Sequence, residues 1–172
     1  MRKGYIQVYT GDGKGKTTAA LGLALRAAGA GLRVLVAQFI KKRKCSEHKA
    51  LERFSDLITV RQYGRGFIMK RQPTKADREL SLKGLQEIAE ALSSKMYDVV
   101  ILDEANVAVH YDLFSADDLL AVITARPKNM EVIITGRYAS EKIIAVADLV
   151  TEMKSVKHYK EQGIKARLGI EY

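Results

Sequence analysis

A glycine-rich stretch that also carries lysines and threonines lies near the start of the chain, from Thr10 to Thr18. It reads TGDGKGKTT, follows the alternating apolar run of residues 5–9 and precedes the alanine-rich apolar run of residues 19–28. A glycine-rich turn between a strand and a helix is the setting of a phosphate-binding loop. Glycines let successive backbone N–H groups point into one concavity, at the positive end of the helix that follows. The stretch therefore predicts a polyphosphate site.

Two side chains of this stretch have further uses. Lys16 can reach terminal phosphates as a point charge, and Thr17 offers a hydroxyl to Mg²⁺. The full pattern has a glycine where Thr10 stands, and Gly11 would take over part of its role. The alternative is a glycine-rich turn with a solvated lysine, which explains the flanking strand and helix less well.

Two acids follow an apolar run in the middle of the chain. Residues 99–102 are apolar, and Asp103 and Glu104 come next. This pattern predicts a buried parallel strand that ends in carboxylates, at the sheet edge where ligands collect. Strand ends are often acidic, so the weight comes from the pairing with the phosphate loop. We expect Asp103 or Glu104 to meet the Mg²⁺ held by Thr17, directly or through water.

An arginine follows another predicted strand, residues 131–135. Because Gly136 and Arg137 come directly after it, Arg137 is placed on the ligand side of the sheet. A guanidinium there can neutralise a polyphosphate. The alternative interpretation of Arg137 is a surface ion pair.

The order of elements predicts an α/β fold with a mostly parallel central sheet flanked by helices, in one domain over residues 1–172. The expected strands are residues 5–9, 33–40, 57–63, 97–104, 131–135 and 148–153. The expected helices are residues 19–28, 47–54, a segment that starts at Thr74, 115–126 and 140–146. The tail, residues 157–172, is basic and then alternates, and we expect it to close the sheet with a hairpin.

Composition sets the class of protein. The 172 residues are 47% hydrophobic and 28% charged, which is ordinary for a globular domain. No apolar run reaches the length of a membrane span, the first residues lead straight into a strand without a signal peptide, and the single cysteine fits a reducing compartment. We therefore expect a cytoplasmic protein. The net charge of +9 indicates either a solvated basic face or an anionic ligand.

Metal and nucleophile patterns are not legible in the sequence. His48, His110 and His158 are far apart and lack metal-ligand spacing, and no serine–histidine–acid triad is visible. Cys45 has basic neighbours at residues 42–44, which would lower the pKa of its thiol. We interpret it as a loop cysteine without a special role.

The motifs together resemble the ATP:corrinoid adenosyltransferases of the phosphate-loop type. The resemblance covers about residues 5–172, and a loop without its first glycine is a family trait. It rests on these segments: YTGDGKGKTTAA at 9–20, VAQFIK at 36–41, ILDEAN at 101–106, TGR at 135–137, ADLVTEM at 147–153, KH at 157–158 and GIE at 169–171.

This resemblance implies a three-layer P-loop NTPase (RecA-like) fold and an enzyme of adenosylcobalamin biosynthesis or salvage. The family transfers the 5′-deoxyadenosyl group of ATP to the Co(I) centre of a reduced corrinoid, cobalamin or a precursor, and releases triphosphate. The resemblance also implies Mg²⁺, a cytoplasmic homodimer, and an electron-donor flavoprotein as a further partner. Neither a membrane nor a nucleic acid is expected as a partner.

Site roles carry over by position. The resemblance implies catalytic roles for Lys16, Glu104 and Arg137, and a magnesium site at Thr17, Asp103 and Glu104. It places the following residues around the nucleotide: Gly11, Asp12, Gly13, Lys14, Gly15, Lys16, Thr17 and Thr18. Phe67 would face the corrin together with Met69, which stands where the family often has tryptophan, and Lys42 stands where a glycine is common.

Two other functions compete with this interpretation. A small-molecule kinase would share the phosphate loop, but it would need a pocket for a phosphoryl acceptor and would release ADP. A nucleic-acid-stimulated ATPase would explain the charge of +9 and would bind polyanions with a steep salt dependence. The sequence shows no aromatic platform for bases.

Overall fold

The computed structural model describes residues 3–66, 68 and 71–172. Its centre is one six-stranded sheet in the order β3-β2-β4-β5-β1-β6. Every pairing between these strands is parallel, so the predicted α/β fold with a mostly parallel sheet is confirmed. The strands are β1 (Ile6–Thr10), β2 (Val34–Phe39), β3 (Ile58–Tyr63), β4 (Val99–Asp103), β5 (Glu131–Thr135) and β6 (Leu149–Glu152).

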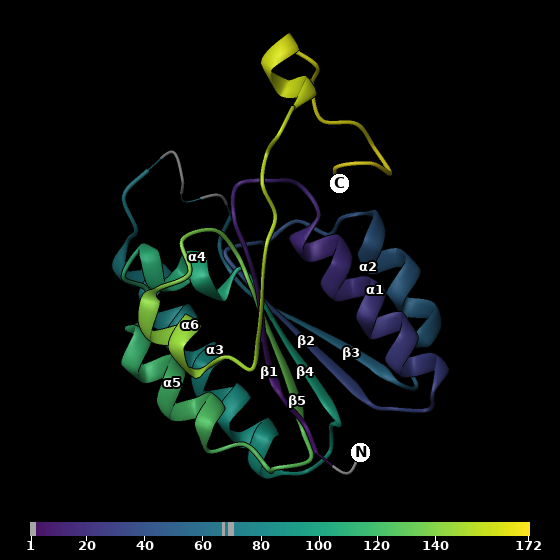
Figure 1. The fold of residues 1–172 in the computed structure, drawn as a ribbon, viewed down its shortest axis with the longest axis vertical. Helices are drawn as coiled ribbons and strands as arrows, with labels where there is room; N and C mark the ends of the chain where they lie inside the picture. The colour runs from purple at the N-terminus through teal and green to yellow at the C-terminus, as the bar shows by residue number, and fades with distance from the viewer. Residues whose placement is uncertain (1–2, 67, 69–70) are drawn as a thin grey trace.

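Helices cover both faces of the sheet and give three layers (Figure 1). One face carries α1 (Lys16–Gly29) and α2 (Ser46–Leu51), which continues into the 3₁₀ turn η1 (Glu52–Phe54). The other face carries α3 (Lys75–Ser93), α4 (Ala105–His110), α5 (Ala116–Thr124) and α6 (Glu141–Val146). This is the layering that the P-loop NTPase resemblance implies.

The core lies in two parts, one on each face of the sheet. In β2, Leu35, Ala37 and Phe39 belong to the core under α3–α6, while Val34 and Val36 belong to the core under α1. Successive side chains of a strand point to opposite faces, so a strand that is apolar apart from Gln38 supplies both cores. The central strands β2, β4 and β5 are therefore buried on both sides, whereas the edge strand β6 is exposed at every residue.

The helix starts show how closely local sequence determines the fold. Thr74 and Asp77 form the predicted capping box at the start of α3, and Ser115 and Asp118 form the one before α5. Helix α1 begins at Lys16, three residues before the predicted start, because Gly15 with φ 123° ends the loop there. Helix α4 was not predicted, because its apolar residues directly continue the pattern of β4.

The predicted hairpin in the tail is wrong. Residues 153–172, all of which the structure describes, contain the 3₁₀ helix η2 (Tyr159–Gln162) and no strand. The apolar residues that suggested a strand stay exposed, with Leu168 at 75% and Ile170 at 57%. A hairpin needs an apolar face to bury, and this segment does not bury one. The tail instead turns back towards the loop before α1 (Figure 1).

Among the described residues, none of the helices combines the length and the apolar character that a membrane span requires.

Candidate nucleotide-binding site

The loop between β1 and α1 has the backbone that its glycines predict. Gly11 has φ 94° and Gly15 has φ 123°, values that side chains disfavour. Gly13 donates its N–H to Met153 O at 2.7 Å, and a Cβ atom on Gly13 would lie 2.7 Å from the same oxygen. The glycines therefore allow both the curvature of the loop and the close passage of the chain that leaves β6.

Two cationic side chains meet at this loop. Lys16 Nζ donates to Gly11 O at 2.6 Å and to Gly13 O at 2.7 Å, so the ammonium lies across the loop. Burial and the nearby Arg137 lower the pKa of Lys16. Arg137 Nη2 donates to Asp12 O at 3.1 Å, and its Nε lies 3.7 Å from Asp12 Oδ1. The fold thus brings Arg137 from the end of β5 to the phosphate loop, as its position predicted.

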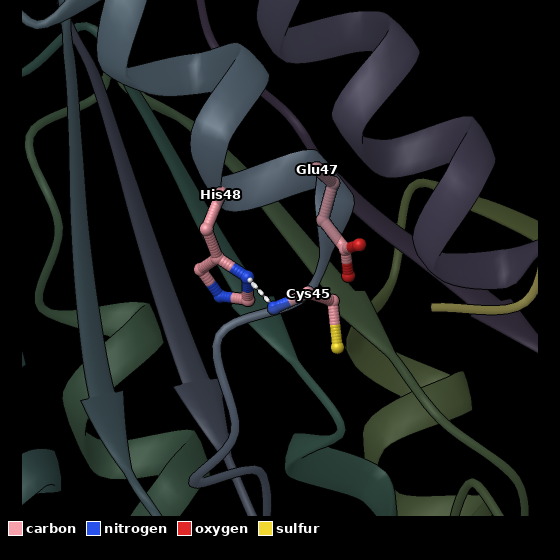
Figure 2. Close-up of side chains that lie close together, drawn as sticks. All are labelled: Cys45, Glu47 and His48. Carbon is pink, nitrogen blue, oxygen red and sulfur yellow. Dashed lines mark hydrogen bonds between the residues drawn. The ribbon is translucent and has the colours of Figure 1, made fainter. Parts of the chain in front are cut away.

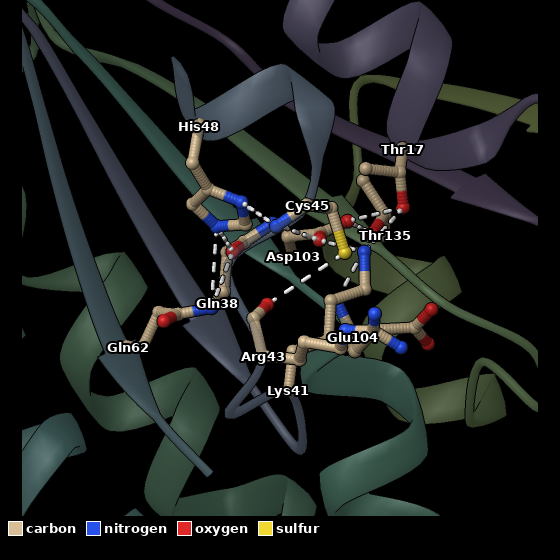
Figure 3. A network of polar contacts seen from close by, with 10 residues as sticks. All are labelled: Thr17, Gln38, Lys41, Arg43, Cys45, His48, Gln62, Asp103, Glu104 and Thr135. Carbon is tan, nitrogen blue, oxygen red and sulfur yellow. Dashed lines mark hydrogen bonds and ion pairs between the residues drawn. The ribbon is translucent and has the colours of Figure 1, made fainter. Parts of the chain in front are cut away.

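Asp103 at the end of β4 is fully buried and accepts hydrogen bonds at both carboxylate oxygens (Figure 3). Oδ1 accepts from Thr17 Oγ1 at 2.8 Å and from Thr135 Oγ1 at 2.7 Å. Oδ2 accepts from Gln38 Nε2 at 3.0 Å and from Lys41 Nζ at 2.9 Å. Burial alone would raise the pKa of Asp103, but the Lys41 ammonium and the hydrogen bonds from Lys41, Thr135 and Thr17 hold it below its ordinary value.

Glu104 differs from Asp103 although the two are adjacent. Its backbone is left-handed, with φ 61°, and its N–H donates to Thr135 Oγ1 at 3.0 Å. Burial raises the pKa of Glu104, and the neighbouring charge of Asp103 raises it further, against the opposite effect of Lys41, Lys16 and Arg137. The Glu104 side chain lines the cleft described below. The two acids therefore have different environments: Asp103 is held by four hydrogen bonds, whereas Glu104 lines the cleft.

The oxygen atoms of this edge fit a hard divalent cation. Thr17, Asp103 and Glu104 supply a hydroxyl and two carboxylates, which are ligand types that Mg²⁺ accepts. Each oxygen of Asp103 already accepts from two protein donors. Mg²⁺ usually keeps several waters, so contact with Asp103 through water suits this arrangement best.

A cleft of about 790 Å³ opens over the loop, a volume typical of ligand sites. Most of the predicted nucleotide residues line it, and Gly11 lies in the same loop beneath them. Its lining includes Asp12, Gly13, Lys14, Gly15, Lys16, Thr17, Thr18, Lys41, Glu47, Glu104, Arg137, His158 and residues 169–172.

The end of the chain forms one wall of this cleft, which sequence reasoning missed. Lys14 Nζ donates to Ile170 O at 2.9 Å and lies 3.5 Å from Glu171 Oε1. Ser46 Oγ donates to Tyr172 O at 3.0 Å. The tail thus contacts both the phosphate loop and the start of α2. No local sequence pattern predicts such contacts, because they join residues that are more than a hundred positions apart.

Sequence reasoning also missed the surroundings of Asp103. Gln38 is 1% exposed in a strand whose other residues are apolar, and Lys41 follows two residues after that strand ends. A buried amide in an apolar strand needs a hydrogen-bond partner, and that requirement is a signal that the sequence does contain. Phe67 and Met69, which were predicted to face the corrin, lie outside the described residues.

Cys45, Glu47 and His48 offer ligand atoms within 4.8 Å of one another (Figure 2). Sequence spacing had suggested no such cluster. However, His48 Nδ1 accepts from the Cys45 N–H at 2.9 Å, and Nε2 lies 2.6 Å from Gln38 Oε1. Both ring nitrogens therefore have protein partners already. The prediction of a lowered thiol pKa is wrong, because burial and Glu47 raise the pKa of Cys45 more than its basic neighbours lower it.

A parallel α/β sheet, a glycine-rich loop that ends in Lys-Thr before a helix, and a buried acid on a nearby strand define a P-loop nucleotide-binding protein. The comparison with protein families identifies which kind. The family model for ATP:corrinoid adenosyltransferase BtuR/CobO/CobP matches residues 2–172. This chain belongs to that family.

Curated relatives agree with this assignment. The corrinoid adenosyltransferase CobA of Salmonella typhimurium (strain LT2) is 39% identical over 99% of this chain and 86% of its own length. The corrinoid adenosyltransferases of Pseudomonas aeruginosa and Escherichia coli (strain K12) are 37% and 38% identical, over 99% of this chain and 84% and 86% of their lengths. The resemblance seen in the sequence is confirmed. The chain is an enzyme of the corrinoid adenosyltransferase class, with ATP and a corrinoid as its substrates.

Proposed function

We propose that the phosphate loop holds the triphosphate of ATP as a leaving group, while C5′ of the ribose faces a Co(I) corrinoid. The cobalt supplies the electron pair of the new Co–C5′ bond. The C5′–O bond breaks, and its electrons leave with the triphosphate. The observation that carries this proposal is that Lys16, Arg137 and the glycine-rich loop line one cleft of about 790 Å³.

Charge neutralisation is the main task of the protein in such a transfer. Lys16 and Arg137 would stabilise the negative charge that develops on the leaving triphosphate. The other N–H groups of residues 11–18 would hold its oxygens at the positive end of α1, since that of Gly13 already donates to Met153 O. No protein nucleophile is needed, since the corrinoid itself is the nucleophile, and this fits the lack of a legible triad.

The two acids would organise the nucleotide's Mg²⁺. Thr17 and Glu104 would contact it directly. Asp103 would contact it through water, because both of its oxygens already accept hydrogen bonds from protein donors. Mg²⁺ would supply charge neutralisation at the phosphates. Glu104 would also act on the reaction by keeping the phosphate end of ATP in one orientation.

The corrinoid side and the assembly are proposed on the family resemblance. Phe67 and Met69 would face the corrin. We further propose that residues 1–172 form a single domain, that the enzyme is a cytoplasmic homodimer, and that a flavoprotein supplies electrons for Co(I). The proposed acceptor of the adenosyl group is cobalamin or a corrinoid precursor of it.

An anaerobic assay tests this function. The enzyme is mixed with ATP, Mg²⁺ and chemically reduced cob(I)alamin, and the visible spectrum is followed. We expect a light-sensitive alkylcobalamin spectrum that depends on enzyme and ATP. Failure to form alkylcobalamin, with transfer of the terminal phosphoryl group of ATP to another acceptor and release of ADP, would mean that the loop serves kinase chemistry instead.

A further inference from the structure

A row of polar side chains crosses three neighbouring strands at the carboxyl end of the sheet. Gln38 on β2 pairs in register with Gln62 on β3 and with Asp103 on β4. Residues paired in register on parallel strands point to the same face, so these three side chains lie side by side. Gln38 and Asp103 are 1% and 0% exposed. Such buried polar groups require partners, and they find them in one another.

His48 on α2 completes this row (Figure 3). Its ring is buried, and Nδ1 accepts from the Cys45 N–H at 2.9 Å. An imidazole nitrogen that accepts carries no proton, so in the neutral ring the proton is on Nε2. Nε2 therefore donates to Gln38 Oε1 at 2.6 Å, because its other polar neighbour, Gln62 Nε2 at 3.2 Å, is an amide donor and cannot accept that proton. The cap of a short helix thus selects the tautomer of the histidine.

The histidine in turn fixes which way the Gln38 amide faces. Oε1 accepts from His48 and, at 3.3 Å, from Gln62 Nε2, so the Gln38 Nε2 group is left to donate to Asp103 Oδ2 at 3.0 Å. The flipped amide would turn its oxygen towards the Asp103 carboxylate and its N–H₂ group towards the His48 N–H. Both contacts would be repulsive in a buried site, where unsatisfied polar groups are costly.

We propose that His48 is a positioning residue for the nucleotide's Mg²⁺, and that it acts through Gln38 on the orientation of Asp103. The inference rests on the proposed function, in which Asp103 helps to organise that cation. A water bound to Mg²⁺ is a direct ligand, and loss of a residue that holds a direct ligand, as Asp103 would here, typically weakens metal affinity 10- to 100-fold. Gln38 and His48 lie one and two steps further out than Asp103, so a smaller effect of about fivefold is expected.

The opposite role, in which His48 is itself a metal ligand with Cys45 and Glu47, conflicts with these contacts. A metal at Nδ1 would displace the Cys45 N–H, and a metal at Nε2 would displace Gln38. Either event would break the path of hydrogen bonds from the Cys45 N–H through His48 and Gln38 to Asp103. The positioning role and the ligand role therefore predict different effects of a Cys45 variant. The Cys45 thiol is needed only if Cys45, Glu47 and His48 bind a metal together.

The test is the Mg²⁺ dependence of ATP binding, measured by titration calorimetry on the full chain without corrinoid. In His48→Asn, the amide oxygen keeps an acceptor for the Cys45 N–H, but the shorter side chain cannot reach Gln38. In Gln38→Met, the link is removed at its centre. We expect each variant to raise the half-saturating Mg²⁺ concentration about fivefold, while ATP affinity without Mg²⁺ stays within about twofold of wild type. The double variant should be no worse than Gln38→Met alone.

Two controls separate the possible outcomes. Cys45→Ser keeps the backbone N–H and should behave like the wild type. A loss in Cys45→Ser equal to that in His48→Asn would overturn the inference in favour of a ligand cluster. An equal loss of ATP affinity with and without Mg²⁺ in both variants would also overturn it, because the role would then be structural.

Asp103→Asn separates this inference from the proposed function. If Asp103→Asn shifts the Mg²⁺ dependence and neither His48→Asn nor Gln38→Met does, the positioning role alone is wrong. If Asp103→Asn leaves the Mg²⁺ dependence unchanged, the proposed role of Asp103 fails, and the positioning role fails with it.

Discussion

At the scale of single residues, the site depends on how a buried carboxylate stays charged. Asp103 accepts four hydrogen bonds, and one of them comes from an ammonium group, Lys41 Nζ, at 2.9 Å. Lys41 Nζ also donates to Thr17 Oγ1 at 3.3 Å, so it contacts two of the three side chains that are proposed to organise the cation. Burial alone would lower the pKa of Lys41, but the Asp103 carboxylate raises it. The pair is therefore ionised, and each charge depends on the other.

The first prediction concerns this pair. Lys41→Met leaves the Asp103 carboxylate buried without a cation, and we expect the free energy of unfolding to fall by about 3 kcal/mol. Adding Asp103→Asn to Lys41→Met should restore part of the loss, because the unpaired charge is then gone. Urea unfolding of the two single variants and the double variant measures this coupling. Simple additivity of the two single effects would contradict the account.

The second prediction concerns Glu104, whose pKa is raised by burial and by Asp103. A raised pKa means that the folded state loses stability as the pH rises through that pKa. Glu104→Gln does not titrate, so it should be more stable than the wild type at pH 7 and lose this advantage below about pH 4, the ordinary range of glutamate. Thermal unfolding across this pH range is the measurement. A variant that is less stable than the wild type at pH 7 would show that the ionised carboxylate is stabilised by its surroundings.

At the scale of elements, the parts that local sequence determines were predictable. The strands at residues 99–103 and 131–135 and the capping boxes at Thr74 and Ser115 follow from apolar runs and from single turns of backbone. Thr17 was expected near the acids at the end of β4, but the other partners of Asp103 were not predictable in this way. Gln38 and Thr135 reach it from strands that are neighbours only because of the order β2-β4-β5, which the sequence does not state.

The third prediction concerns the start of α3. Asp77 accepts from Arg71 at 2.6 and 2.8 Å and from Thr74, and these bonds hold its pKa well below the ordinary value although burial opposes them. A lowered pKa means stability that is present above the unfolded pKa and is lost as the pH falls. Asp77→Asn should therefore destabilise the protein at pH 7, and the difference should shrink below about pH 4. Chemical unfolding at several pH values checks this. A difference that does not change with pH would assign the effect to the cap geometry alone.

At the scale of the whole molecule, the cleft is closed by segments from opposite ends of the chain. The loop that begins with Gly11 supplies its floor, and residues 169–172 supply one wall. The contacts of Lys14 with Ile170 and Glu171 join these two segments. The predicted hairpin is wrong because an alternating apolar pattern does not reveal whether its apolar side chains become buried. In this segment they stay exposed beside the cleft.

The fourth prediction concerns this wall. Deletion of residues 169–172 should weaken ATP binding about 10-fold, since a loss of roughly 1.4 kcal/mol of contact and enclosure corresponds to that factor. The melting temperature should change little, because the segment is not part of either core. Calorimetric titration with ATP and a thermal melt measure the two effects. Unchanged ATP affinity would show that the wall does not enclose the nucleotide.

The most direct test of the central claim is the identity and amount of the phosphate product in a single turnover. Enzyme in excess is mixed anaerobically with ATP, Mg²⁺ and reduced corrinoid, and the products are quantified by phosphorus NMR and by the visible spectrum. The account predicts one inorganic triphosphate for each alkylated corrinoid, without ADP, and no product from Lys16→Ala although this variant folds. Release of ADP, or turnover by Lys16→Ala equal to that of the wild type, would contradict the claim that the loop holds triphosphate as the leaving group.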